Sequence, residues 1–216
     1  MGNNVGSPNR LQLDALREIS SIGAGNAVTA LSQFVGKKVE MAPPAAVLAS
    51  AKEIPQLIPA EITMITMVIL EILGAVGGHI LFIFEQKNAL SLIDLLMGKR
   101  PDSVTTTLSE IDISALKEVA SVMSGAYLGV LGDMTNKTLK MTPPFCSLGV
   151  SSEISDFIIT HSLKDEEITV CLNSHFWISG HNVAISGYII LIPLSSSLRI
   201  LLRLLGMEGD NAKAYN

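Results

Sequence analysis

The sequence predicts a mixed α/β (α+β) fold, a single domain of two pseudo-twofold-related halves that share one sheet-based core. Residues 14–44 recur without a gap as residues 114–144, and an in-register repeat of that length indicates two related units. Each unit has the pattern of a long helix followed by antiparallel strands and a short helix, and each is too small for a full core. We therefore expect one domain over residues 1–216, with internal repeats at about 11–98 and 111–207.

The first half begins with a long helix. Ser7-Pro8 is typical of a helix start, with serine as the N-cap and proline at the first helical position. An apolar stripe at helical spacing then runs to about Val35, and Gly36 follows as a stop signal. Pro43-Pro44 forbids a helix and leads into strand-like segments. A shorter helix is expected over residues 88–97.

Residues 62–84, between these helices, are almost continuously apolar and are long enough to cross a bilayer. Glu71 lies near the middle of the stretch, where a carboxylate inside a membrane is costly. Gly74-Ala75-Val76-Gly77-Gly78 is typical of a turn, and the flanking runs are rich in residues that favour strands. The pattern therefore predicts a buried β-hairpin and no membrane span.

The second half repeats this order after a polar junction at Lys99–Ser109. A helix is expected from about Ile111 to Leu131, then Pro143-Pro144, and finally a closing helix at about 195–205. Strands are expected at residues 157–160, 167–172 and 187–192. The offset between the halves grows from 100 to 109, because Gly78-His79-Ile80 aligns with Gly187-Tyr188-Ile189. An insertion therefore lies within residues 150–186.

Composition and charge exclude several classes of protein. The net charge is −5 and no run of Lys or Arg is present, which disfavours a nucleic-acid partner because phosphate binding needs a basic stripe. The two cysteines are too few for a disulfide scaffold and indicate reduced thiols in a cytoplasmic protein. The four histidines are scattered, so no metal site is expected. Residues 1–10 lack the apolar segment of a signal peptide.

Polar residues recur on one face of both long helices. Asp14, Glu18, Ser21 and Gly25 are spaced so that they share one helix face, opposite the apolar stripe. The second copy repeats the arrangement with Ser114, Glu118, Ser121 and Gly125. A solvated face without a role is the ordinary explanation for such residues. Their recurrence at the same spacing favours a functional surface in each half.

The spacing resembles the signature of the CheC–CheX–FliY phosphatases of bacterial and archaeal chemotaxis, which is Asp or Ser, three residues, Glu, two residues, Asn, twenty-two residues, Pro. The matching residues are Asp14, Glu18 and Pro44 in the first copy and Ser114, Glu118 and Pro144 in the second. The segments 22–27 and 125–128 also resemble those that follow the motif in CheC. Two motif copies in a chain of this length are similar to CheC, since CheX carries one motif and FliY a further flagellar-switch domain. Where the family has Asn, this chain has Ser21 and Ser121.

The resemblance implies a reaction and a role for each residue. The target would be the phosphoryl-aspartate of the response regulator CheY, which supplies Mg²⁺, so the chain needs no cofactor of its own. Glu18 and Glu118 would dock against a cationic side chain of the regulator. Ser21 and Ser121 stand where the family's Asn orients the attacking water, although a serine hydroxyl is shorter and its proton rotates freely. Asp14 and Ser114 would cap or orient the face.

Whether the chain is an enzyme stays open at this stage, because phosphoryl hydrolysis depends on such positioning. In one interpretation the chain is a weak CheY phosphatase in which serine replaces the missing amide. In the other it is a binding protein that holds the phosphorylated regulator, or the receptor deamidase CheD that CheC proteins bind, without turnover. Residues 145–149 lack the acidic residue of a typical CheC, which bears on CheD. The doubled motif disfavours an unrelated soluble fold.

Overall fold

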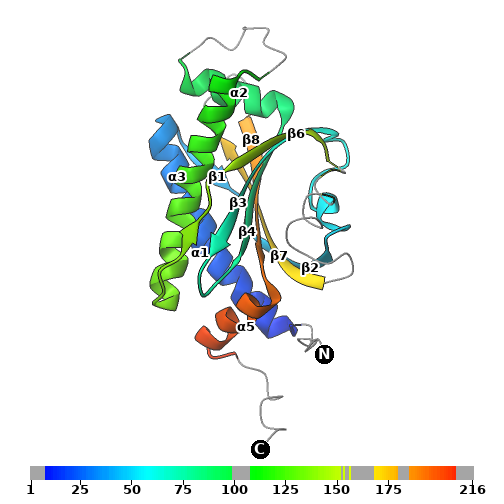
Figure 1. Cartoon of the computed structure of the whole chain (residues 1–216), viewed down its shortest axis with the longest axis vertical. Coiled ribbons are helices and arrows are strands. Elements are labelled where there is room, and N and C mark those ends of the chain that lie inside the picture. Colours follow the sequence, from blue (N-terminus) through cyan, green and yellow to red (C-terminus); the bar gives the residue numbers. More distant parts are fainter. Residues whose placement is uncertain are drawn as a thin grey trace, which may run out of the picture.

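One curved antiparallel sheet with two long helices packed on one of its faces forms the body of the molecule, as a computed structural model shows (Figure 1). The structure describes residues 8–98, 108–151, 153, 156, 168–179 and 185–207. The expected mixed α/β single domain is confirmed.

The helices and strands follow the predicted order in each half. The first half contains α1 (Arg10–Val35), β1 (Val39–Met41), β2 (Ala45–Ser50), the 3₁₀ helix η1 (Ile54–Leu57), β3 (Met64–Leu73), β4 (Gly78–Glu85) and α2 (Gln86–Leu96). The second half contains α3 (Glu110–Thr135), β5 (Lys140–Met141), β6 (Phe145–Val150), β7 (Ile168–Ile178), β8 (Ile185–Pro193) and α5 (Ser195–Leu204). The expected strand at residues 157–160 and most of the junction at 99–109 lie outside the described residues.

Each long helix begins at a capping box. Asn9 accepts a hydrogen bond from the backbone N–H of Gln12, whose side chain in turn accepts one from the backbone N–H of Asn9. The prediction that Pro8 is the first helical residue is therefore wrong, because Asn9 caps the helix after it. Ser109 and Asp112 form the same reciprocal pair at the start of α3.

The long helices end at residues in the left-handed region. Gly36, at φ 64°, ends α1 as predicted, since glycine adopts this conformation without a steric cost. Asn136, at φ 49°, ends α3. The second helix therefore runs one turn beyond the predicted Leu131. Gly132, which follows Leu131, stays helical, and the left-handed conformation that ends the helix is reached only at Asn136, a residue type that tolerates it.

The strand order interleaves the two halves. It reads β1-β7-β8-β4-β3-β5, with β2 also pairing β7 and β6 also pairing β3, and all pairs are antiparallel. Exchanging β1, β2, β3 and β4 for β5, β6, β7 and β8 gives the same order read from the opposite edge of the sheet. It is the order expected if the chain consists of two related halves.

The strand registers show where along the chain the sequence offset between the two halves increases. Ser50 of β2 faces Ile168 of β7, and Val150 of β6 faces Met64 of β3 in the corresponding pair. The partners Met64 and Ile168 are thus 104 positions apart, whereas Ser50 and Val150 are 100 apart. Four residues of the insertion consequently precede β7, and the remainder lies between β7 and β8.

The sheet is covered on both faces, which explains why the β3–β4 hairpin is so apolar. Val68 and Phe82 face α1 and α3, while Met67 and Leu81 face a second core that includes Ile54 of η1. Figure 1 shows η1 on the side of the sheet opposite the two long helices. Central strands buried on both faces need continuous apolar runs. None of the helices in the described part of the chain is long and apolar enough to span a bilayer.

The two cysteines are free, and they differ in burial. Burial raises the pKa of Cys171 to about 12, and nearby Glu53 adds to the shift. Burial also raises the pKa of the half-buried Cys146, although nearby Lys117 opposes it. Because the thiolate is the reactive form, we expect an aromatic disulfide reagent at about pH 8 to modify Cys146 first and Cys171 only after unfolding. Equal reaction rates of both thiols in the native chain would contradict this assignment.

Candidate functional site

The residues of the doubled motif lie where the helical spacing placed them, on the outer faces of α1 and α3. On α1, Asp14 and Glu18 are exposed, while Ser21 and Gly25 are half-buried. Their neighbours Leu16 and Ile19 are buried against the sheet, and the motif side chains consequently point away from it. We name Asp14, Glu18, Ser21 and Gly25 the α1 face.

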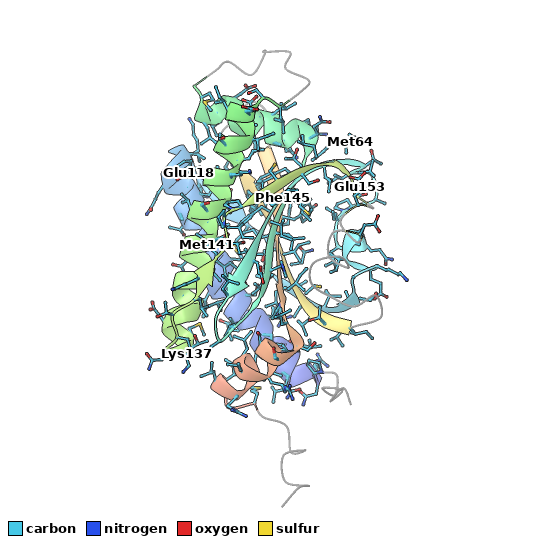
Figure 2. The ribbon with its side chains drawn as sticks, viewed as in Figure 1. Met64, Glu118, Lys137, Met141, Phe145 and Glu153 are labelled. Atoms are coloured by element: carbon cyan, nitrogen blue, oxygen red, sulfur yellow. The ribbon has the colours of Figure 1, made fainter. Side chains whose placement is uncertain are left out.

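The second copy builds a matching surface on α3. Ser114, Glu118 and Gly125 are exposed, and Ser121 is half-buried. Figure 2 places Glu118 on the helical side of the molecule. We name these four residues the α3 face. Because α1 and α3 pack side by side on the sheet, both faces belong to one helical layer (Figure 1).

The two motif carboxylates carry unneutralised charge. Neither Glu18 nor Glu118 forms an ion pair with another described residue, and both are exposed. Asp14 instead pairs with Arg17 at 3.1 Å, one turn along the same helix. The helix N-caps are Asn9 and Ser109, and the orienting role of Asp14 and Ser114 on the face stays a prediction.

The two motif serines differ in what their hydroxyls do. The Ser121 hydroxyl donates a hydrogen bond to the backbone carbonyl of Lys117 at 2.9 Å. The Ser21 hydroxyl makes no such bond to the described part of the chain. A hydroxyl has a single proton to donate, so Ser121 in this arrangement only accepts, whereas Ser21 both donates and accepts.

The helix pair is held together beneath these faces by a contact that sequence reasoning missed. Tyr127 of α3 is fully buried, and its ring lies against Gly23 of α1, where an added Cβ would come within 2.6 Å of it. Its hydroxyl donates to Ser20, also fully buried, at 3.1 Å. Burial raises the pKa of Tyr127 well above its usual value. The signal in the sequence was Ser20 itself, since the second copy has the apolar Ala120 at that position.

The motif prolines lie apart from the helix faces, at the edges of the sheet. Pro44 is buried and Pro144 half-buried, and each immediately precedes an edge strand, β2 or β6. Proline cannot donate to a ladder, and an edge position tolerates this. Backbone hydrogen bonds continue the antiparallel pairing just before each proline pair. The Ala42 N–H donates to the His175 carbonyl at 2.8 Å, and the Thr142 N–H donates to the Glu71 carbonyl at 2.9 Å. The prolines thus direct the chain from the short to the longer edge strand.

No metal-binding cluster is found among the described residues, in the sense of three or more His, Cys, Asp or Glu side chains grouped to hold an ion. His175 lies against Tyr188 and Trp177, with ring centroids 4.8 and 5.7 Å away, and burial lowers its pKa. Trp177 and His175 are therefore part of a packed aromatic group on the sheet. His161 and His181 lie outside the described residues.

Comparisons with known proteins find similarity to CheC and FliY. Residues 11–48 match the model of the CheC-like family. The chain is 26% identical over 197 residues to the CheY-P phosphatase CheC of Bacillus subtilis, covering 90% of this chain and 94% of that protein. It is also 26% identical over 160 residues to the flagellar motor switch phosphatase FliY of the same organism, covering 74% of this chain and 41% of FliY.

A crystal structure of FliY from Thermotoga maritima shares the fold. It superposes with a TM-score of 0.75 at 19% sequence identity, and the match covers 94% of this chain and 100% of the FliY chain. The resemblance to the CheC–CheX–FliY family is therefore confirmed, and the chain is a homologue of CheC and FliY.

Proposed function

We propose that the chain acts in chemotaxis by docking a phosphorylated CheY-type response regulator on the α1 and α3 faces and slowly hydrolysing its aspartyl phosphate. The observation that carries the proposal is the doubled constellation of an exposed, unpaired glutamate one turn before a half-buried serine on each long helix. Homology to a CheY-P phosphatase over most of the chain supports it.

The chemistry needs little from this chain beyond positioning. Water attacks the phosphorus atom, the bond from phosphorus to the aspartyl oxygen breaks, and inorganic phosphate and a free carboxylate result. The regulator supplies the aspartyl phosphate and the Mg²⁺ that balances its charge. Glu18 and Glu118 would bind a cationic group of the regulator, and the serines would hold the attacking water in line.

We assign turnover to the α1 face. A residue that orients water must accept a hydrogen bond from it and, to align the water with the phosphoryl group, also donate one to a phosphoryl oxygen. The free Ser21 hydroxyl can do both. Ser121 donates to the Lys117 carbonyl, so it can accept from water but has no proton left for the phosphoryl group.

A function without turnover is the second candidate, and the Ser121 hydrogen bond favours it for the α3 face. In this case the chain would hold the phosphorylated regulator without accelerating its decay. Binding of CheD stays a prediction of the family resemblance. Decay of the phosphorylated regulator, measured with and without the chain, separates the two candidates.

Removing both motif glutamates tests docking under either candidate. We expect Glu18→Ala/Glu118→Ala to weaken binding of a beryllium-fluoride-activated CheY by up to about fivefold at each face, because an exposed ion pair contributes up to about 1 kcal/mol there. Titration calorimetry measures the affinity. Glu61→Ala is the matched control, since Glu61 is an exposed carboxylate on the segment after η1, on the other side of the sheet. Equal affinity of the double variant and the unchanged chain for the regulator would contradict the docking assignment.

A further inference from the structure

A groove continues from the α3 face along the same helix. Gly125, Gly129 and Gly132 of α3 form one wall, and the segment 137–141, which returns beside the helix, forms the other. Its volume is about 870 Å³. Figure 2 shows Glu118, Met141 and Lys137 along this side of the molecule. Because Gly125 belongs to both the α3 face and the groove, the two form one continuous surface. We name it the α3 groove.

The rim of the α3 groove is basic. Lys137 and Lys140 are exposed, and within the described ranges neither forms an ion pair. Asp133 lines the helical wall, so the lining carries two positive charges against one negative. The chain as a whole has a net charge of −5. A locally basic rim on an acidic protein favours an acidic partner segment over a basic one.

Packing within the chain does not explain the glycine at position 129. Gly129 is exposed in the middle of α3, and a Cβ there would meet no atom within 4 Å. Glycine destabilises a helix interior relative to alanine, and its use is explained where another backbone approaches closely. Gly132 has an internal reason, since a Cβ there would come within 2.9 Å of the Lys137 carbonyl oxygen.

The corresponding part of the first half is filled. Thr29 stands at the position of Gly129 and donates to the Gly25 carbonyl at 2.8 Å. Ser32 stands at the position of Gly132 and donates to the Lys37 carbonyl at 2.7 Å. Side chains therefore occupy the wall of α1 where α3 is bare, and their polar groups are satisfied by the chain's own backbone.

One of the two basic positions of the groove is replaced in the first half, while Lys37 keeps the position of Lys137. Glu40 stands at the position of Lys140, pairs with Lys38 at 2.7 Å and accepts a hydrogen bond from the Ser179 hydroxyl. The Lys38 hydrogen bond is the largest cause that lowers the pKa of Glu40. The wall of the second half thus lacks the Thr29 and Ser32 side chains and carries two lysines, whereas the first half has those side chains and only Lys37 of the two basic positions.

We propose that the α3 groove receives an acidic segment of the regulator that docks at Glu118. The glycine wall would admit the backbone of that segment, and Lys137 and Lys140 would bind its carboxylates. This inference rests on the proposed function and adds a division of labour to it. The α3 side supplies affinity through the groove, while the α1 face, with its free Ser21, supplies turnover.

Exchanging residues between the halves tests the proposal. We expect Gly129→Thr, which copies Thr29, to weaken binding of a beryllium-fluoride-activated CheY by about tenfold without lowering the melting temperature, because threonine is a better helix former than glycine. Loss of affinity together with unchanged or greater stability distinguishes an occupied groove from a damaged fold. The reciprocal Thr29→Gly leaves affinity within about twofold.

A second experiment reverses the charge of the two lysines on the rim of the α3 groove. We expect Lys137→Glu/Lys140→Glu to weaken binding by about tenfold and to flatten its dependence on salt, since rim charges act through screened electrostatics. Lys37→Glu, at the repeat-equivalent position in the first half, is the matched control and should change affinity little.

The outcomes separate this inference from the function on which it rests. If Glu118→Ala weakens binding while Gly129→Thr and the double lysine variant bind like the unchanged chain, the groove assignment is overturned and docking stands. If the unchanged chain does not bind the activated regulator, both are overturned. If the groove variants weaken binding of the activated regulator while Thr29→Gly and Lys37→Glu leave its affinity unchanged, the proposal is supported.

Discussion

Replacing Ser21 and Ser121 by asparagine together is expected to accelerate the decay of phosphorylated CheY by about 100-fold relative to the natural chain. An amide offers a donor and an acceptor on one planar arm, so it can hold the attacking water and a phosphoryl oxygen at once. Positioned hydrogen-bonding groups of this kind typically change rates by about 10²–10³-fold. Both positions are partly exposed on the outer helix faces, so the longer side chain can extend toward solvent. Phosphate release from the regulator in the presence of Mg²⁺ measures the rate.

The single variants show which face turns over. We expect the natural chain to accelerate the decay of phosphorylated CheY slightly. Ser21→Ala should abolish this acceleration and Ser121→Ala should leave it unchanged, because only the Ser21 hydroxyl is free to donate. Ser121→Asn alone should raise the rate, since the amide does not depend on the bond to Lys117. Identical rates for the natural chain, the double asparagine variant and the regulator alone would refute the phosphatase scaffold.

Replacing Gly23 by leucine is expected to destabilise the chain by about 3 kcal/mol. The new Cβ would lie 2.6 Å from Cε1 of the Tyr127 ring, which is fully buried and cannot move aside without disturbing the core. For a chain of this size that loss lowers the melting temperature by about 6–12 °C. Thermal unfolding followed by circular dichroism gives the value.

A rescue variant shows that the loss comes from this contact. In the repeat, Met123 corresponds to Gly23 and Ala27 corresponds to Tyr127, and both are fully buried. This pair therefore places the large side chain where the first pair has the glycine, and the small one where it has the tyrosine. Gly23→Leu/Tyr127→Ala should therefore recover much of the stability. Gly25→Ala is the control on the same helix, where a Cβ meets no atom within 4 Å, and it should stabilise by about 0.5–1 kcal/mol. A destabilised control, or no recovery, would contradict this account.

Local signals in the sequence determined the elements. Periodicity and stop residues predicted α1, the β3–β4 hairpin and the Gly36 terminus, because these depend on interactions between residues close in the chain. The start of α1 was misplaced, since Ser7-Pro8 and Asn9 are competing local signals and the bond from Gln12 decides between them. The helix faces also followed from spacing, because the helical period alone puts Asp14, Glu18 and Ser21 together.

By itself, then, the sequence determined which segments are helices and strands, which motif residues share a face, and which family the chain resembles. The tertiary structure alone decided how the halves combine. It paired β1 and β2 of the first half with β7 of the second, and it joined Ser20 to Tyr127 across 107 positions. It also turned the Ser121 hydroxyl onto its own helix and opened the α3 groove beside Lys137. These features depend on contacts between segments far apart in the chain and on side-chain orientation, and neither follows from local periodicity.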